Sequence, residues 1–139
     1  MHWINQYMSC PYVDCGRDLN YGLDCWGLVR DVLQKQFGVP LLASFGMIYP
    51  DDKTGMTQGF KHVVKTFKPQ KGPVAGSVAT GFSGSNLIHV GVCVESNGLK
   101  VLHTSRRHGP SSHSVTHFQR LFHNVVYYHY DSNNSSLSK

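Results

Sequence analysis

Residues 22–29 read Gly22-Leu23-Asp24-Cys25-Trp26-Gly27-Leu28-Val29, and this stretch leads from a loop into an amphipathic helix. Apolar side chains recur at the spacing of one helical face, at Leu28, Val29, Val32, Leu33 and Phe37. The pattern predicts a helix from about Cys25 to Phe37, because Gly38 and Pro40 follow as stop signals. A cysteine therefore stands at the first position of a predicted helix.

The position of Cys25 bears on its chemistry. Its thiol would lie at the positive end of the helix macrodipole, beside backbone N–H groups that lack partners. Both features favour the thiolate, which is the nucleophilic form, so Cys25 is the best nucleophile candidate in this chain. The alternative is a buried, unreactive cysteine that packs as a small apolar residue. A histidine close to the thiol would favour the nucleophile, and the chain has histidines later in the sequence.

The composition is that of one globular domain. The chain has 139 residues, of which 40% are hydrophobic, and its formal net charge is +5. This length suits a single domain, expected over residues 1–131, and the Ser/Asn-rich segment 132–139 is expected to be a disordered tail. The positive charge is not gathered into a stripe of Lys and Arg, so nucleic acid is not an expected partner.

The sequence also bears on location and cofactors. The first residues lack a basic segment followed by an apolar run, and no stretch approaches the about 18 apolar residues of a membrane span. We therefore expect synthesis in the cytoplasm without a signal peptide, and no membrane span. In that reducing compartment, disulfides between Cys10, Cys15, Cys25 and Cys93 are not expected. The chain has neither a Cys-x-x-Cys pair nor a His-Glu-x-x-His motif, so no metal or other cofactor is expected.

Helical patterns come first and strand patterns second. A short helix is predicted over residues 2–9, a loop over 11–22, an irregular connection over 38–55 and a second long helix from Met56 to Phe67. Strands are predicted over 76–82, 87–95, 99–104 and 125–130, with a polar loop over 106–112. This order predicts an α+β fold in which the helix that starts at Cys25 packs on one face of an antiparallel sheet.

A histidine that could serve as a base begins the strongest predicted strand. Alternation along residues 88–94 places Ile88, Val90, Val92 and Val94 on one face, and His89, Gly91 and Cys93 on the other. Gly91 would leave space beside His89 for a helix start or a substrate. His89 is therefore the candidate general base, and the alternative is an ordinary surface or core histidine.

A second histidine could orient the first. His103 lies on the next predicted strand, and the turn at Ser96-Asn97-Gly98 brings it within a few residues of His89 across the hairpin. An imidazole partner of this kind fixes the tautomer of a catalytic base. Tyr12, in the loop before Cys25, could donate its hydroxyl to an oxyanion alongside the backbone N–H of Cys25. The alternative for Tyr12 is an exposed loop residue with no role.

These motifs resemble those of the NlpC/p-sixty family of papain-like cell-wall peptidases. The resemblance rests on Pro11-Tyr12, the Asp-Cys-Trp-Gly-Leu-Val motif at residues 24–29, His89-Val90-Gly91-Val92 and Leu102-His103, and it spans residues 3 to 130. It is strongest to a branch that includes stand-alone and phage tail-associated proteins. Two departures stand out, since Cys15 occupies a loop position where glycine is usual and Ser77 one where aspartate is common.

The resemblance implies a papain-like, NlpC-type fold and a cysteine peptidase. It assigns the nucleophile to Cys25, the base to His89, the orienting residue to His103, and an oxyanion or substrate contact to Tyr12. It implies hydrolysis of peptidoglycan stem peptides at a D-γ-glutamyl bond to diaminopimelate or lysine. Phage tail proteins are further implied partners, and the resemblance is compatible with a protein carried in the virion or delivered to the cell wall.

Two alternatives remain open at the level of sequence. One is a structural or assembly component of a phage tail tip that does not use this chemistry, against which the complete set of Cys25, His89 and His103 counts. The other is a transacylase or deamidase that uses the same thiol. Hydrolysis and transfer differ in how well water is excluded from the acyl-enzyme, which sequence does not reveal.

Overall fold

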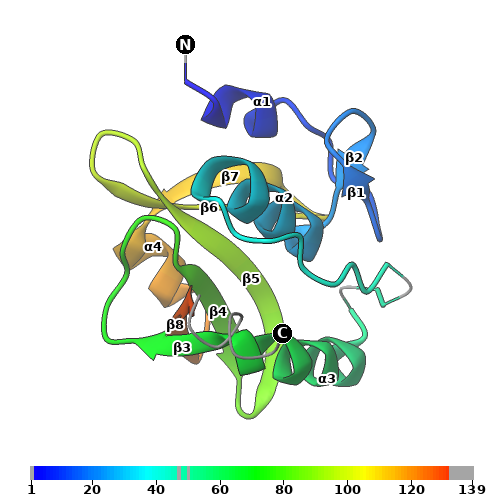
Figure 1. The fold of residues 1–139 in the computed structure, drawn as a ribbon, viewed down its shortest axis with the longest axis vertical. Coiled ribbons are helices and arrows are strands. Elements are labelled where there is room, and N and C mark those ends of the chain that lie inside the picture. The colour runs from blue at the N-terminus through cyan, green and yellow to red at the C-terminus, as the bar shows by residue number, and fades with distance from the viewer. Residues whose placement is uncertain (1, 47, 50, 132–139) are drawn as a thin grey trace.

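A six-stranded antiparallel sheet forms the centre of the computed structural model, which describes residues 2–46, 48, 49 and 51–131. The predicted tail over 132–139 lies outside the described residues. The strand order is β3-β8-β4-β5-β6-β7. The strands are β3 (Phe67–Gln70), β4 (Val78–Ser83), β5 (Asn86–Glu95), β6 (Leu99–Ser105), β7 (Gly109–Ser114) and β8 (Asn124–Tyr130) (Figure 1).

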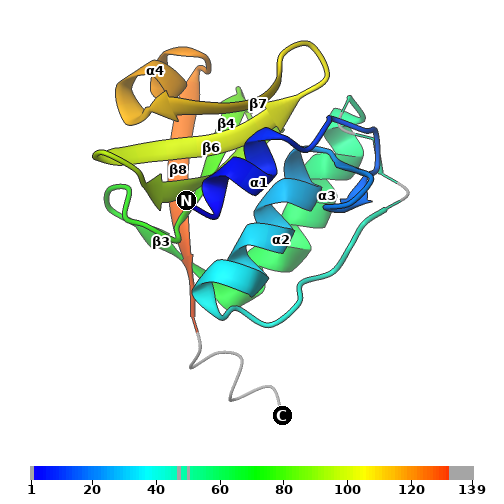
Figure 2. The same ribbon diagram turned by 90° about the horizontal axis from the view of Figure 1, so that it is seen from above.

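Helices cover both faces of this sheet. Figure 2 shows α1 (Ile4–Met8), α2 (Cys25–Phe37) and α3 (Lys53–Val63) on one side and α4 (Val115–Arg120) on the other. A single turn of 3-10 helix, η1 (Val64–Thr66), links α3 to β3, and a small hairpin of β1 (Arg17–Asp18) and β2 (Gly22–Leu23) precedes α2. The molecule is therefore an α+β fold with α2 packed on the sheet, as the sequence predicts.

Two apolar cores result, one on each face of the sheet. The larger core joins α1, α2 and α3 to the sheet, and includes Tyr7, Leu28, Val32, Val63, Val90 and Val92. The smaller core lies under α4, and consists of Ala79, Cys93, Val101, Phe118 and Tyr127. The alternation of β5 thus sends its valines towards α2 and Cys93 towards α4, because successive side chains of a strand point to opposite faces.

The boundaries of α2 agree with the prediction. The side chain of Asp24 accepts a hydrogen bond from the backbone N–H of Gly27 and so caps the first turn. Gly38 ends the helix with a left-handed backbone, at φ 69°. Cys25 is consequently the first residue of a capped helix.

Three segments differ from their predictions. The predicted polar loop over 106–112 is confirmed only at residues 106–108, because residues 109–114 form β7, a polar edge strand that pairs with β6. The predicted helix over 56–67 begins earlier, at Lys53, because Asp52 caps it, and it ends at Val63. Phe67 belongs instead to β3, an edge strand that contains Pro69. The predicted loop over 11–22 contains most of the β1–β2 hairpin.

Candidate active site

An open cavity of about 260 Å³ lies where β5 and β6 separate. The pairing of these strands runs from Glu95–Leu99 to Val92–Leu102. Beyond this last pair, the residues of β5 before Val92 and those of β6 after Leu102 are no longer paired with each other. The cavity is lined by Tyr12, Cys25, Asp51, Lys53, Ile88, His89, Thr104, Ser105 and Arg106. Three of the four residues predicted to form the site, Tyr12, Cys25 and His89, therefore border one space.

A β-bulge at Ile88 interrupts the alternation of β5 beside this space. Gly81 of β4 pairs with His89, whereas the next residue, Phe82, pairs with Leu87, which leaves Ile88 as the extra residue. Ile88 and His89 both border the cavity as a result, although strict alternation would send them to opposite faces. On the other side of Cys25, a narrower, mostly apolar cavity of about 40 Å³ extends under α3.

His103, the fourth predicted residue, lies directly behind His89. The Nε2 atom of His89 is 2.9 Å from Nδ1 of His103, which is a hydrogen bond between the two imidazoles. The predicted contact between these histidines is confirmed. Nδ1 is thus the nitrogen of His89 that remains for a reaction partner.

Gly91 makes this contact possible by a different route from the one expected. A Cβ atom built at Gly91 would lie 3.1 Å from Cβ of His103 and 2.7 Å from a methyl group of Val101. The space beside His89 is therefore filled by β6 and not left open for a helix or substrate. Because Gly91 faces His103, His89 reaches His103 diagonally across the hairpin.

The contacts of the His103 ring extend further than the sequence indicates. Its Nε2 atom lies 2.9 Å from Nδ1 of His113, a half-buried residue of β7. His113 stacks in turn on His117 of α4, with 4.0 Å between ring centroids. The rings of Phe118 and Phe122 pack against His89 on the α4 side. Sequence analysis assigned no role to His113, because it follows the predicted loop over 106–112 and lies on no predicted strand.

Burial determines the resting protonation of the site. Desolvation, with a smaller contribution from the negative charge of Asp24, raises the pKa of Cys25 to about 12. Backbone hydrogen bonds at Val90 and Trp26 oppose this shift but are outweighed. Desolvation lowers the pKa of His89 to about 4. The resting pair is a neutral thiol and a neutral imidazole, which is the opposite of the direction expected for Cys25 from its helix start alone.

Tyr12 borders the cavity but its hydroxyl is occupied. The hydroxyl donates to Oδ1 of Asp14 at 2.9 Å, and Arg106 holds the same carboxylate through Nη2 at 2.9 and 3.0 Å. Desolvation and the contact with Asp14 raise the pKa of Tyr12. Since a phenol has one donor hydrogen, Tyr12 would have to exchange Asp14 for a substrate oxygen before it could stabilise an oxyanion. Its predicted role therefore stays a prediction.

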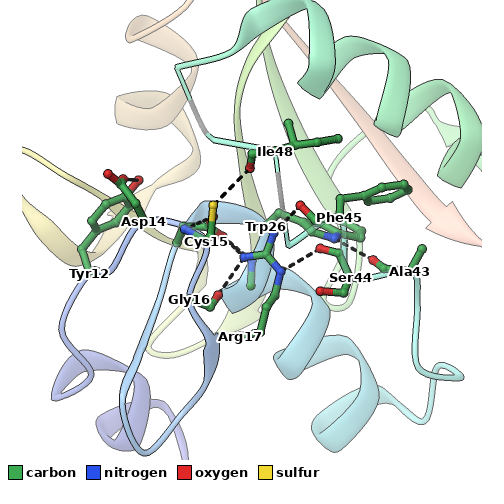
Figure 3. A network of polar contacts seen from close by, with 12 residues as sticks. Tyr12, Asp14, Cys15, Gly16, Arg17, Trp26, Ala43, Ser44, Phe45 and Ile48 are labelled. Carbon is green, nitrogen blue, oxygen red and sulfur yellow. Dashed lines mark hydrogen bonds and ion pairs between the residues drawn. The ribbon is translucent and has the colours of Figure 1, made fainter.

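Arg17 ties the start of α2 to a wall formed by residues 43–45 (Figure 3). Its guanidinium donates to the carboxylate of Asp24, to the carbonyl of Ser44 at 2.7 Å and to that of Phe45 at 3.3 Å. Trp26 donates from Nε1 to the carbonyl of Ala43 at 2.9 Å, in the same wall. These contacts stabilise the backbone on which Cys25 sits.

Thr104 and Cys15 complete the surroundings of the site. Thr104 is buried, borders the cavity, and its hydroxyl has no hydrogen-bond partner among the described residues. Cys15 does not line the cavity, and its thiol lies 3.7 Å from the carbonyl oxygen of Ile48. All four cysteines are free thiols.

No group of three or more His, Cys, Asp or Glu side chains within residues 2–46, 48, 49 and 51–131 is placed to hold a metal ion. None of the described helices is both long and apolar enough to cross a membrane. Comparisons with protein-family models, with curated proteins and with solved structures found no significant match for this chain.

Proposed function

We propose that this protein is a cysteine peptidase of the papain-like, NlpC type that hydrolyses an amide bond in peptidoglycan stem peptides. One observation carries the proposal. Cys25 and His89 border the same open cavity, and the far nitrogen of His89 is hydrogen-bonded to His103 at 2.9 Å. A nucleophile, a base and a group that orients the base are the three parts that this chemistry requires.

The resting protonation suggests how the reaction begins. Because Cys25 and His89 are both neutral, the proton of the thiol moves to Nδ1 of His89 as the sulfur attacks the amide carbonyl. His89 then gives that proton to the leaving amine, and the C–N bond breaks to leave an acyl-enzyme. Water adds to the acyl group with His89 as base, which releases the acid and restores the thiol.

The surroundings of the cavity suit a polar peptide with carboxylate groups. Lys53 and Arg106 border the cavity together with Asp51, and the two cations can attract carboxylates such as those of a stem peptide. The backbone N–H of Cys25, at the start of α2, is the first candidate to stabilise an oxyanion. The D-γ-glutamyl bond to diaminopimelate or lysine is the substrate bond that the family resemblance implies.

A detail of the loop before α2 supports the resemblance. Cys15 occupies a position where the family usually has glycine, and its backbone is left-handed, with φ 60°. Glycine adopts this conformation without strain, whereas other residues rarely do. The loop thus keeps a backbone shape suited to glycine, although its residue has changed.

Digestion of defined muropeptides tests the proposal. Wild-type protein is expected to release products that mass spectrometry assigns to one amide bond, and Cys25→Ala to release none while it keeps the wild-type melting temperature. In ¹⁸O-labelled water, hydrolysis places the label in the new carboxylate, whereas transfer to an amine does not. Cleavage by Cys25→Ala at the wild-type rate, or a folded wild-type protein inert on stem peptides of both diaminopimelate and lysine types, would refute it.

A further inference from the structure

We propose that His113 is a positioning residue for the reaction, because it fixes through His103 which nitrogen of His89 carries the proton. This inference rests on the proposed role of His89 as the base. It adds a third imidazole, from the edge strand β7, to the two that the sequence indicates. Two observations carry it, the hydrogen bond from His89 to His103 and the one from His103 to His113, each 2.9 Å long.

The chain of imidazoles has only two consistent arrangements of protons. A neutral imidazole carries one N–H, so each ring donates through one nitrogen and accepts through the other. In the first arrangement, His89 donates from Nε2 to Nδ1 of His103, and His103 donates from Nε2 to Nδ1 of His113. In the second, both hydrogen bonds run in the opposite direction.

Only the first arrangement leaves His89 able to act as a base. With its proton on Nε2, His89 presents an unprotonated Nδ1 to accept the proton of Cys25. In the second arrangement Nδ1 of His89 already holds a hydrogen, and the base is blocked. His113 therefore determines whether the site is competent, because its Nδ1 must be free to accept from His103.

His113 is also more open to solvent than His103, its partner in this chain. It is half-buried, whereas His103 is only 5% exposed. When the thiol proton reaches Nδ1 of His89, the Nε2 proton of His89 can pass to His103 and that of His103 to Nδ1 of His113. Each N–H bond that breaks is matched by one that forms, so one positive charge moves from the buried rings to His113.

The same geometry makes the site sensitive to acid. A proton that His113 takes from solvent occupies Nδ1 and reverses both hydrogen bonds, which blocks His89. The groups that face His113 are His103 from β6, His117 from α4 and His108 from the turn before β7. Helix α1, which also contacts β7, lies on the opposite face of the sheet from His117 and α4 (Figure 2). Desolvation, followed by the charges of His117 and His108, lowers the pKa of His113.

Two substitutions separate the proposed role from simple packing. His113→Leu removes the acceptor for His103, whereas His113→Asn can place a carbonyl oxygen near the position of Nδ1 but cannot be protonated near neutral pH. His123→Leu is the matched control, because it removes an exposed histidine that does not border the cavity.

The first readout is spectroscopic and needs no substrate. Nitrogen-15 NMR of labelled wild-type protein at pH 7.5 is expected to show the Nε2–H tautomer for His89, His103 and His113. His113→Leu is expected to give a mixture of tautomers at His103, and His113→Asn to keep Nε2–H even at pH 5. A proton on Nδ1 of His103 in the wild-type protein at pH 7.5 would overturn the proposal.

The second readout is the rate at which iodoacetamide alkylates Cys25. His113→Leu is expected to lower this rate by about tenfold, since outer partners of functional histidines typically have effects of that size. His113→Asn and His123→Leu are expected to stay within about threefold of wild type at pH 7.5. As the pH is lowered, alkylation of Cys25 is expected to slow at a lower pH in His113→Asn than in wild type, because asparagine is not protonated in this range. The proposal would be refuted if wild type, His113→Leu, His113→Asn and His123→Leu were alkylated at equal rates and lost that rate at the same acidic pH. This holds whether or not muropeptides are cleaved.

Discussion

In the proposed reaction Cys25 and His89 share one proton, and its position determines their reactivity. Between the lowered pKa of His89, about 4, and the raised pKa of Cys25, about 12, the pair holds a constant number of protons. The reactive form, with the proton on His89, is then a constant and small fraction of the protein. A thiol without such a partner behaves differently. At pH values below its pKa, its thiolate fraction rises about tenfold for each unit by which the pH increases.

We therefore expect the alkylation rate of Cys25 to be nearly flat from pH 7 to pH 9. Cys15, whose pKa desolvation also raises, serves as the internal reference and is expected to react faster with each pH unit. The measurement is peptide mass spectrometry after iodoacetamide labelling. In His89→Ala the rate at Cys25 is expected to rise with pH as well, and a flat profile in that variant would contradict the shared proton.

The buried histidines also predict how stability depends on pH. Desolvation lowers the pKa of His89 to about 4 and that of His103 to about 3, from 6.5 in the unfolded chain. Below pH 6.5 the unfolded chain takes up protons that the folded protein does not, so the free energy of unfolding falls as the pH is lowered towards 4. Each histidine contributes at most about 1.4 kcal/mol per pH unit.

Urea unfolding at pH 7, 5.5 and 4.5 measures this loss. His103→Gln is expected to lose stability less steeply with acid than wild type, because one of the two groups is gone. His123→Leu should follow the wild-type slope. Identical slopes for His103→Gln and wild type would show that the buried imidazole does not titrate as expected.

At the scale of elements, the first turn of α2 depends on Asp24. This carboxylate caps the helix at Gly27, accepts the N–H of Cys15 at 3.0 Å and pairs with Arg17. Asp24→Ala removes all three contacts and leaves a largely buried guanidinium without its carboxylate partner, with only backbone carbonyls as acceptors. We expect the free energy of unfolding to fall by about 3 kcal/mol, as measured in urea.

Asp52 is a matched control for Asp24. It caps α3 at Gly55 but is exposed and makes one capping bond. Asp52→Ala is expected to cost about 1 kcal/mol. Equal losses for the two variants would mean that Arg17 and Cys15 add nothing to the cap at Asp24.

The β5–β6 hairpin depends on Gly91 for the contact between its histidines. A methyl group there would come within 2.7 Å of Val101 and 3.1 Å of His103, so β6 would have to move. Gly91→Ala is expected to cost about 1 to 3 kcal/mol of stability and to remove the His89–His103 hydrogen bond. Gly72→Ala, where a Cβ meets nothing within 4 Å, is the control. An unchanged imidazole spectrum in Gly91→Ala would contradict this account.

At the scale of the whole molecule, Arg106 connects three segments around the cavity. From the turn after β6 it pairs with Asp14 of the loop before α2 and with Asp51 of the segment before α3. Its side chain is 55% exposed, so solvent screens these pairs and they add little to stability. These ion pairs instead affect the shape and the charge of the cavity entrance.

We expect Arg106→Gln to raise the KM for a stem peptide several-fold with little change in kcat, because Arg106 attracts carboxylates before the reaction begins. The effect should shrink as salt is added, since exposed charges are screened. Arg107→Gln removes the same charge from a neighbour that does not line the cavity. An equal rise in KM for both variants would assign the effect to net charge alone.

Local patterns in the sequence determined the central elements of this protein. The apolar spacing after Cys25, with Asp24 and Gly38 at its ends, was enough to predict α2, because caps and helical periodicity act over a few residues. Alternation and turn residues likewise predicted β5, β6 and the contact between His89 and His103. Strand β7 was missed, because its residues Gly109–Ser114 have no apolar alternation and gain their structure from pairing with β6.

Tertiary structure alone decided the protonation of the site and the reach of its hydrogen bonds. The helix start at Cys25 favours a thiolate, but only the packed fold shows that burial outweighs it and keeps the thiol neutral. His113 and Arg106 join the site through segments distant from Cys25 in sequence. Desolvation and long-range contacts depend on which surfaces are covered when the chain has folded, and local patterns do not contain that information.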